Sequence, residues 1–98
     1  MPAYVINDMD ITDPQRFEEY KRLSPPTVAA YGGKFLSRGG EVTALEGGWQ
    51  PRRLVMLEFP SVAQAQAWLN SPEYAPARTL RQLSTNSRMV VIEGTSPP

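Results

Sequence analysis

A short, nearly continuous apolar segment, Leu54–Phe59, most constrains what this chain can fold into. Prolines flank it at Pro51 and Pro60, and proline interrupts both helices and central strands. The segment is too short for a typical helix but has the length of a typical strand. Because apolar residues occupy both alternating positions, we expect both faces of this strand to be covered. Glu58 is the exception, since a carboxylate in such a run costs several kcal/mol if it stays dry and unpaired.

The residues after this strand carry two helix-start signals. Ser61 and Gln64 fit a capping box, in which the serine accepts from a backbone amide and the glutamine side chain reaches back. They predict a helix that ends at Asn70. Ser71–Pro72 is a second start signal, but Pro76 would remove a hydrogen bond deeper in that helix, so we expect the regular helix to begin near Pro76. Its predicted apolar face is Ala77, Leu80 and Leu83.

The first half of the chain repeats this order of signals. We predict a strand Ala3–Met9, a helix that starts at Asp13–Pro14, restarts at Ser24–Pro25 and ends at Gly32, and a strand Lys34–Arg38. A last strand, Met89–Glu93, follows the second helical segment. Strand, helix and strand twice over predict an α+β, ferredoxin-like βαββαβ fold, with a four-stranded antiparallel sheet and helices on one face. Residues 1–94 are expected to form one domain and residues 95–98 a disordered tail.

The second face of the predicted sheet also needs cover. Three of the strands are apolar at both alternating positions, as Ile6 beside Val5 and Met56 beside Val55 illustrate. An uncovered apolar face of that size exceeds what monomers usually expose. We therefore predict a two-fold homodimer joined through the sheet face. Whether Glu41–Glu46 forms a short extra strand that contributes to the dimer stays open.

Charge and composition exclude several classes of function. The ten basic and ten acidic residues balance, which argues against nucleic-acid binding and against an anionic membrane surface. The chain has no cysteine and no histidine, so it lacks thiolate chemistry, the commonest general base and the usual haem ligand. We expect no metal site and no cofactor. Neither a signal peptide nor an apolar run of membrane-spanning length is recognisable, so a cytoplasmic protein is expected.

Residues spread over most of the chain resemble those of one family. They are Phe35–Gly40, Leu45–Gly47, Trp49, Glu58–Ser61, Ala65, Trp68, Ser71–Tyr74, Arg81 and Glu93–Gly94. With them the chain resembles the DUF1330 family of domains of unknown function, which looks like a branch of the dimeric α/β barrel superfamily. The resemblance implies the fold and a dimer. Relatives by fold include antibiotic-biosynthesis monooxygenases and muconolactone isomerases, and an analogy of fold is weak warrant for function.

One carboxylate and five larger side chains are the candidate site residues. Glu58 is the candidate catalytic residue, as a proton donor or acceptor. The candidate ligand-binding residues are Arg38, Trp49, Trp68, Tyr74 and Arg81. Each also has a structural interpretation. The glycines after Arg38 could form a plain turn, and the tryptophans could belong to the core or to an interface. Tyr74 and Arg81 could pair with Glu58 or Glu93.

Two hypotheses follow from these residues. In the first, the protein binds a small apolar or aromatic metabolite and is a cofactor-free oxygenase or isomerase, so that Glu58→Gln abolishes turnover without unfolding the dimer. In the second, it is a non-catalytic dimeric binding or interaction domain in which Glu58 and arginines form a structural network. Arg81→Ala would then lower stability and shift the balance between monomer and dimer.

Overall fold

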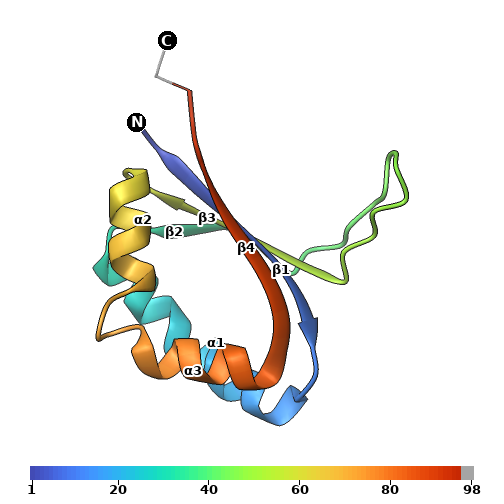
Figure 1. The fold of residues 1–98 in the computed structure, drawn as a ribbon, viewed down its shortest axis with the longest axis horizontal. Coiled ribbons are helices and arrows are strands. Elements are labelled where there is room, and N and C mark those ends of the chain that lie inside the picture. Colours follow the sequence, from blue (N-terminus) through green and yellow to red (C-terminus); the bar gives the residue numbers. More distant parts are fainter. Residues whose placement is uncertain (96–98) are drawn as a thin grey trace.

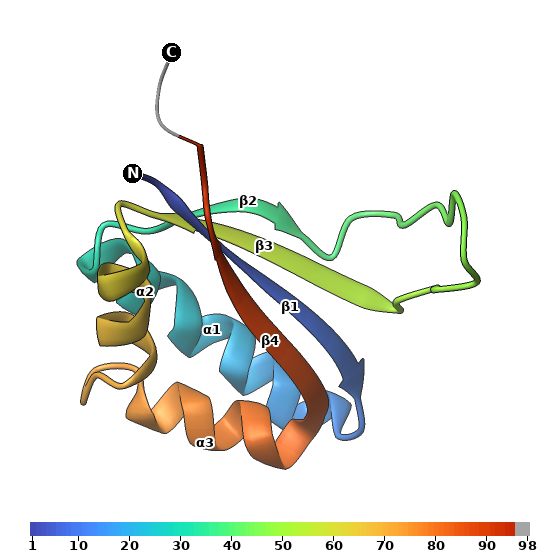
Figure 2. The same cartoon turned by 45° about the horizontal axis from the view of Figure 1, so that its top comes forward.

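The computed structural model describes residues 1–95, and this part of the chain contains four strands and three helices. In chain order they are β1 (Ala3–Ile11), α1 (Pro14–Ala30), β2 (Lys34–Arg38), β3 (Arg53–Phe59), α2 (Val62–Leu69), α3 (Ala75–Ser84) and β4 (Thr85–Glu93). The strands form one antiparallel sheet in the order β2-β3-β1-β4, and the helices cover one of its faces (Figures 1 and 2). The predicted α+β ferredoxin-like fold is confirmed.

The core lies between the sheet and the helices. In β3, Val55, Leu57 and Phe59 are buried, while Met56 and Glu58 between them are only half-buried. Successive side chains of a strand point to opposite faces, so the buried set faces the helices. Trp68 of α2 packs on Phe59, with ring centres 5.2 Å apart. The apolar segment Leu54–Phe59 therefore supplies the centre of the core.

Helix α1 continues through Ser24–Pro25, where a restart was predicted. Pro25 and Pro26 both lie inside the helix, and each removes one backbone hydrogen bond. The carbonyl groups left without a partner belong to Lys21 and Arg22, which are exposed residues, so water can satisfy them. The predicted restart was wrong because proline breaks are tolerated on the solvent side of a packed helix.

The predicted helix ends are mostly confirmed. Gly32 follows α1 with a φ of +76°, which is the left-handed conformation expected there. The Ser61 hydroxyl oxygen accepts from the Gln64 backbone amide at 3.0 Å. The Gln64 side chain does not return to Ser61 but donates to the carbonyl of Tyr31 at 3.0 Å. This bond ties the start of α2 to the end of α1 in place of the second half of a capping box.

Helix α3 begins at Ala75, close to the predicted start, but a different side of it is buried. Ala77 and Arg81 are buried together with Tyr74, whereas Leu83 is 54% exposed. The predicted apolar face was thus wrong in part. Since α1 and α3 lie side by side (Figure 2), the side of α3 that carries Arg81 is turned inward. A guanidinium is accepted there because it finds hydrogen-bond partners, which are described below.

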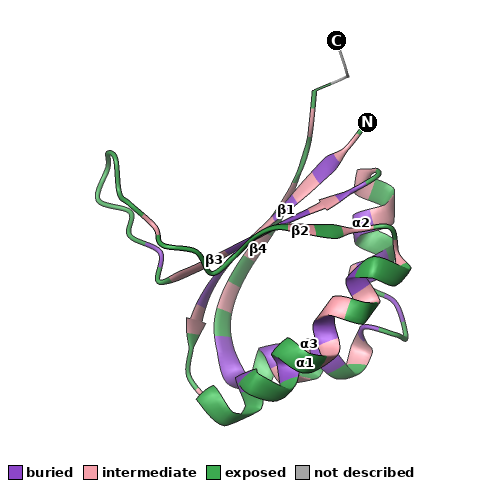
Figure 3. Ribbon diagram, turned by 180° about the vertical axis from the view of Figure 1, so that it is seen from behind, coloured by how far each residue is buried: buried purple, intermediate pink, exposed green. Residues whose placement is uncertain are grey.

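Residues 39–52 form an arm that extends away from the rest of the molecule (Figure 1). The arm contains no strand, so the extra strand left open at Glu41–Glu46 is not formed. Its side chains are largely exposed (Figure 3). Leu45 is 93% exposed and Trp49 is 59% exposed.

The sheet face opposite the helices, here called the open face, carries no helix (Figures 1 and 2). Alternation along the strands places a row of apolar side chains on it. They are Tyr4, Ile6, Leu54, Met56, Val90 and Ile92, of which Val90 and Ile92 are 60% and 58% exposed. The expectation of a second apolar sheet face therefore holds for this chain.

The strands at both ends of the chain are longer than predicted. β1 continues to Ile11 and β4 begins at Thr85, and the two pair along their whole length. The Gly94 amide still donates to the carbonyl of Pro2 at 2.7 Å. Residues 96–98 of the predicted tail lie outside the described residues. None of the helices in the described part is both long and apolar enough to cross a membrane.

Candidate functional site

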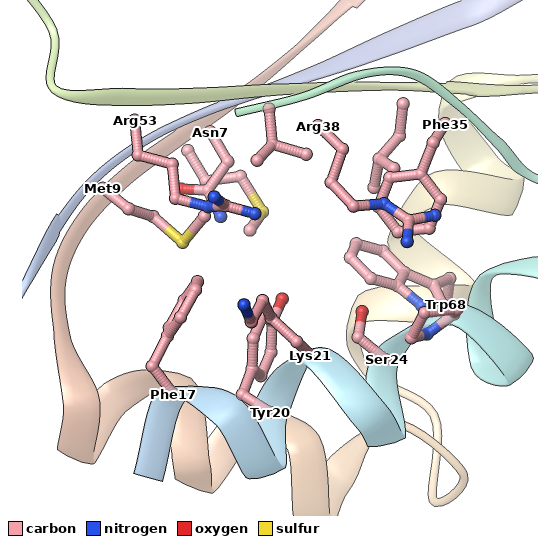
Figure 4. A pocket seen from close by; sticks show the side chains of 14 residues that line it. Asn7, Met9, Phe17, Tyr20, Lys21, Ser24, Phe35, Arg38, Arg53 and Trp68 are labelled. Atoms are coloured by element: carbon pink, nitrogen blue, oxygen red, sulfur yellow. The ribbon is translucent and has the colours of Figure 1, made fainter. Parts of the chain in front are cut away.

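A small cavity lies between the sheet and the helices (Figure 4). Val55, Leu57 and Met89 line it from the sheet, while Phe17 and Tyr20 of α1 and Trp68 of α2 line it from the helices. Its free volume is about 30 Å³, which is room for about two water molecules. The walls are thus mostly aromatic and aliphatic, as in a typical small-molecule site.

Two arginines bring positive charge to this apolar cavity. Arg38 of β2 and Arg53 of β3 both line it, and their guanidinium groups extend into the space between sheet and helix (Figure 4). Within the described residues, neither has a carboxylate within 4.0 Å, and no Asp or Glu lines the cavity. Lys21 also lines it, but its ammonium group pairs with Glu18 at 2.8 Å. The cavity is therefore positive, and its charge is carried by the two arginines.

A β-bulge directs Arg38 into the cavity. Phe35 pairs with Leu57, but the register then shifts, so that Ser37 pairs with Met56 and Arg38 with Val55. Without the extra residue, Arg38 would sit opposite Leu54 and point to the open face. Bulges often re-aim a side chain in this way. The guanidinium carbon of Arg38 then lies 3.6 Å from the centre of the Phe35 ring, which is a close cation–π contact.

Arg53 is held against glycine and an aromatic ring. Its guanidinium carbon lies 5.1 Å from the centre of the Phe17 ring. Gly39, with a φ of +68°, lies on its other side, and a Cβ there would come within 2.8 Å of the Arg53 Cζ. Arg53 Nε is buried and has no hydrogen-bond partner among residues 1–95. The chain bends at Gly39 and then runs on into the arm instead of forming the tight Gly39–Gly40 turn, and Gly39 leaves room for the second arginine.

A hydrogen-bonded pair of tyrosines supports one wall. The hydroxyl groups of Tyr20 and Tyr74 are 2.9 Å apart, and Tyr74 is fully buried behind Tyr20. Burial raises the pKa of Tyr74, the Tyr20 hydroxyl raises it further, and the guanidinium of Arg81 partly offsets both effects. Either hydroxyl can be the donor of the bond between the two tyrosines. When Tyr74 donates, the Tyr20 proton is available for a further acceptor.

Two further polar groups lie at the cavity. Asn7 is 4% exposed, and its Oδ1 has no hydrogen-bond partner within the described residues. Trp68 is 1% exposed, and its indole N–H donates to the Thr27 hydroxyl at 3.1 Å, so it offers the cavity only its ring. A buried amide without a partner costs about 1–3 kcal/mol, and such groups often mark a place for water or ligand.

The structure brings only some of the predicted site residues together. Arg38 and Trp68 line the cavity, while Tyr74 and Arg81 lie behind its wall. Arg81 donates to the Ser87 hydroxyl at 2.9 Å. Its predicted pairing with Glu58 or Glu93 is wrong, because neither carboxylate lies within 4.0 Å of it.

Glu58 and Trp49 lie outside the cavity. The Glu58 side chain projects from the open face, where its carboxylate is 3.1 Å from the Lys34 ammonium group. Trp49 lies on the arm, and its indole N–H donates to the Asp8 carboxylate at 3.3 Å. Asp8 also accepts from Arg88 at 2.9 Å, and this bond raises the pKa of Arg88. Glu58 and Asp8 of the open face therefore have charged partners, whereas no acidic residue lines the cavity.

Sequence reasoning missed Asn7, Tyr20, Lys21 and Arg53 as cavity residues. Arg53 had a detectable signal, because it shares strand parity with Val55, Leu57 and Phe59, which were expected to be buried. Phe17, Tyr20 and Leu23 recur every three residues, a spacing that indicates a buried helix face but no role in a site. Asn7 and Lys21 gave no signal, since only packing of sheet against helix brings them to one space.

The chain matches one protein family over almost its whole length. Residues 2–95 match the model of the family described as "Domain of unknown function (DUF1330)". No curated protein matches the chain. Within the described residues there is no group of three or more acidic, cysteine or histidine side chains placed to hold a metal ion.

Several solved structures share the fold at low sequence identity. A protein of unknown function from Rhodopseudomonas palustris has a TM-score of 0.77 and 22% identity over 98% of this chain and 84% of its own. SnoaB, a cofactor-independent oxygenase from Streptomyces nogalater, has a TM-score of 0.66 and 15% identity, with coverage of 98% and 95%. A dimeric ferredoxin-like protein of unknown function from Jannaschia sp. CCS1 has a TM-score of 0.71 and 14% identity, with coverage of 96% and 100%. At these identities the likeness shows the fold alone.

Proposed function

This chain belongs to the DUF1330 family of domains of unknown function, and from its cavity we propose that it binds a small apolar or aromatic metabolite as a homodimer. The observation that carries the proposal is a single space walled by Phe17, Tyr20, Phe35 and Trp68 that also receives two unpaired guanidinium groups. Apolar walls with a few converging polar groups are typical of small-molecule sites.

The enzymatic form of this proposal is an oxygenase or isomerase that needs no cofactor. The cavity contains no carboxylate and no imidazole, so no residue in it is a conventional general base. An acidic substrate could still lose its proton to a water molecule in the cavity, because Arg38 and Arg53 would stabilise the resulting enolate or phenolate. The shared fold with a cofactor-independent oxygenase is compatible with this chemistry. Glu58, on the open face, takes no part in it.

The homodimer is proposed to form through the open face. Val90 and Ile92 are more than half exposed on that face, and the arm places Trp49 near Asp8 at its border. A neighbour of the same fold is described as dimeric. Burying the apolar row against a second copy would remove it from water at about 25 cal/mol per Å². The Asp8–Arg88 pair lies on this face as well, so it could help to fix the register of the two copies.

The second hypothesis, a non-catalytic dimeric domain, keeps one supporting observation. The Asp8–Arg88 ion pair, with Trp49 as a further donor to Asp8, is a polar network on the proposed dimer face. It uses different residues from the predicted Glu58–arginine network. The two hypotheses differ in whether a bound molecule is changed, since both allow binding.

The proposal is tested by mass spectrometry of small molecules that co-purify with the protein. We expect an aromatic compound with the wild type, and its loss with Met89→Trp, which fills the cavity. Leu83→Trp, on the exposed side of α3, should retain the compound and serves as the control. Equal retention by Met89→Trp, or retention of no aromatic compound, would contradict the proposal. Incubating the compound with protein in air and separating the products by chromatography then distinguishes conversion from simple binding.

The expected cytoplasmic location stays a prediction, which cell fractionation can check.

A further inference from the structure

Resting on the proposed function, we infer that the ligand of the cavity is an aromatic carboxylate. Its ring would take the place over Phe35 that the Arg38 guanidinium now occupies, and its carboxylate would bind the guanidinium groups of Arg38 and Arg53. Arg38 is thus both the group that fills the empty site and the group that recognises the ligand's charge.

The first argument is the unbalanced charge. Arg38 and Arg53 approach one space, and neither has a carboxylate within 4.0 Å among the described residues. A charge-assisted, bidentate contact with a carboxylate is among the strongest hydrogen-bonded pairs, and a carboxylate in this space could make it with either guanidinium. Arg53 Nε is buried without a partner, so this donor is already desolvated before a ligand arrives. A neutral ligand would leave both charges as they are.

The second argument is the position of the Arg38 guanidinium. It is a flat group stacked on an aromatic ring, with 3.6 Å between the guanidinium carbon and the centre of the Phe35 ring. An aromatic ring of a ligand can stack on Phe35 in the same manner. Arg38 is an exposed residue with a long side chain, so it can move outward at low cost. The β-bulge fixes the direction of its Cβ toward the cavity, so a displaced guanidinium stays at the cavity mouth.

The third argument is the size of the cavity. A free volume of about 30 Å³ holds water but not an aromatic ring. Of the groups around the space, Arg38 and Lys21 are the exposed ones, whereas Phe17, Tyr20 and Trp68 are buried. The aromatic ring of a ligand can therefore enter when an exposed cationic side chain moves out, and the buried core side chains can stay in place. The displaced Arg38 then meets the ligand's carboxylate, which couples opening of the site to recognition of charge.

The fourth argument is the remaining polar groups. The Tyr20 hydroxyl lies in the cavity wall, and it can donate to an oxyanion when Tyr74 donates to it. The buried Asn7 Oδ1 is an acceptor without a partner among the described residues, so it suits a water molecule or a donor group of the ligand rather than an oxyanion. No carboxylate in the cavity wall would repel one. The charged side chains that line the cavity are all cationic and therefore favour a negative ligand.

The test compares 2-naphthoate with 2-naphthamide, which has nearly the same shape and no charge. Binding of each to the wild type is measured by isothermal titration calorimetry, and we expect naphthoate to bind about tenfold or more tightly than naphthamide. Arg38→Met and Arg53→Met keep most of the side-chain volume and remove the charge. Each should reduce naphthoate affinity about tenfold and leave naphthamide affinity unchanged. Arg22→Met, on the exposed side of α1, is the matched control and should change neither.

Arg38→Ala gives a signature that a general charge effect would not produce. It removes both the charge and the group that fills the site, so naphthamide should bind more tightly while naphthoate binds more weakly. Circular dichroism melts would show whether each variant is folded. Arg38 is exposed, so its variants keep the test decisive if Arg53→Met fails to fold.

The outcomes separate this inference from the proposed function. If naphthamide and naphthoate bind the wild type equally, the cavity takes aromatic compounds but does not select carboxylates, and the inference is overturned. The same holds if naphthoate binds more tightly but Arg38→Met and Arg53→Met do not weaken it, because the charge is then recognised elsewhere. If neither compound binds, both the inference and the proposed aromatic site are contradicted.

Discussion

Arg38 and Phe35 stand three residues apart in β2, yet the Arg38 guanidinium carbon lies 3.6 Å from the centre of the Phe35 ring. In a regular strand, residues an odd number apart point to opposite faces. The bulge between Phe35 and Ser37 inserts one residue and puts both side chains on the helix-covered face. This single irregularity gives the cavity one of its two exposed cations, the other being Lys21. Without it, Arg38 would lie on the open face with Lys34 and Glu58.

The first prediction concerns Gly39, which lies against Arg53. Gly39→Ala should lower the free energy of unfolding by more than Gly47→Ala does. Both glycines have positive φ, at +68° and +84°, so both variants carry the strain of a left-handed alanine, about 1 kcal/mol. Only at Gly39 would the new Cβ overlap the guanidinium of Arg53, because a Cβ at Gly47 would have no atom within 4 Å apart from its own chain neighbours. Urea unfolding measures the difference, and equal losses would show that Arg53 moves aside freely.

The second prediction concerns pH. The folded-state pKa of Tyr74 is raised above its ordinary value of 10.0, mainly by burial. A raised pKa means that the folded state keeps the proton longer than the unfolded chain, so this contribution to stability is complete below pH 10 and is lost as the pH rises above it. We expect the free energy of unfolding to fall above pH 10 with a slope approaching about 1.4 kcal/mol per pH unit from this group.

Tyr74→Phe isolates that contribution. The variant should be about 1–2 kcal/mol less stable near neutral pH, since Tyr20 and Arg81 lose a hydrogen-bond partner. Its stability should then fall less steeply than that of the wild type above pH 10. Urea titrations between pH 8 and pH 11 provide the comparison, with Tyr31→Phe, at an exposed hydrogen bond to Glu73, as control. Parallel slopes for the wild type and Tyr74→Phe would contradict the assignment.

The third prediction concerns Glu58, the candidate catalytic residue of the sequence interpretation. Glu58→Gln should leave the affinity for 2-naphthoate unchanged, because the side chain projects from the face opposite the cavity. Its stability should change by about 1 kcal/mol or less, since the Lys34 side chain of the ion pair is 67% exposed. Calorimetry on Glu58→Gln and Arg38→Met side by side is the check. A loss of affinity in Glu58→Gln as large as that in Arg38→Met would return Glu58 to the site.

The fourth prediction concerns the proposed dimer. Ile92→Glu should shift the protein toward monomer, because it places a charge within the apolar row on the open face. Leu83→Glu is a closely matched control, with an exposed fraction of 54% against 58% for Ile92, and it lies on α3 away from that face. Sedimentation velocity at several protein concentrations reports the mass. A monomeric wild type, or a dimer that survives Ile92→Glu, would exclude the open face as the interface.

Much of the fold followed from the sequence because its signals are local. Proline on both sides of β3, the cap at Ser61 and the left-handed Gly32 fix where elements begin and end, and they do so within a few residues. Two strand–helix–strand units then leave few antiparallel arrangements. The apolar pattern on both faces of the strands also predicted the open face.

The site could not be predicted in the same way, because the tertiary structure decides it. The direction of the Glu58 side chain depends on which of the two alternating sets of β3 faces the helices. The direction of the Arg38 side chain depends on a β-bulge that has no clear signal in the sequence. Arg81 is buried because α3 packs beside α1 and brings it to Tyr74. By itself the sequence determined the elements and their order, since hydrophobic alternation and caps act over a few residues. Only packing decided which charges share a space, since that depends on contacts between residues far apart in the chain.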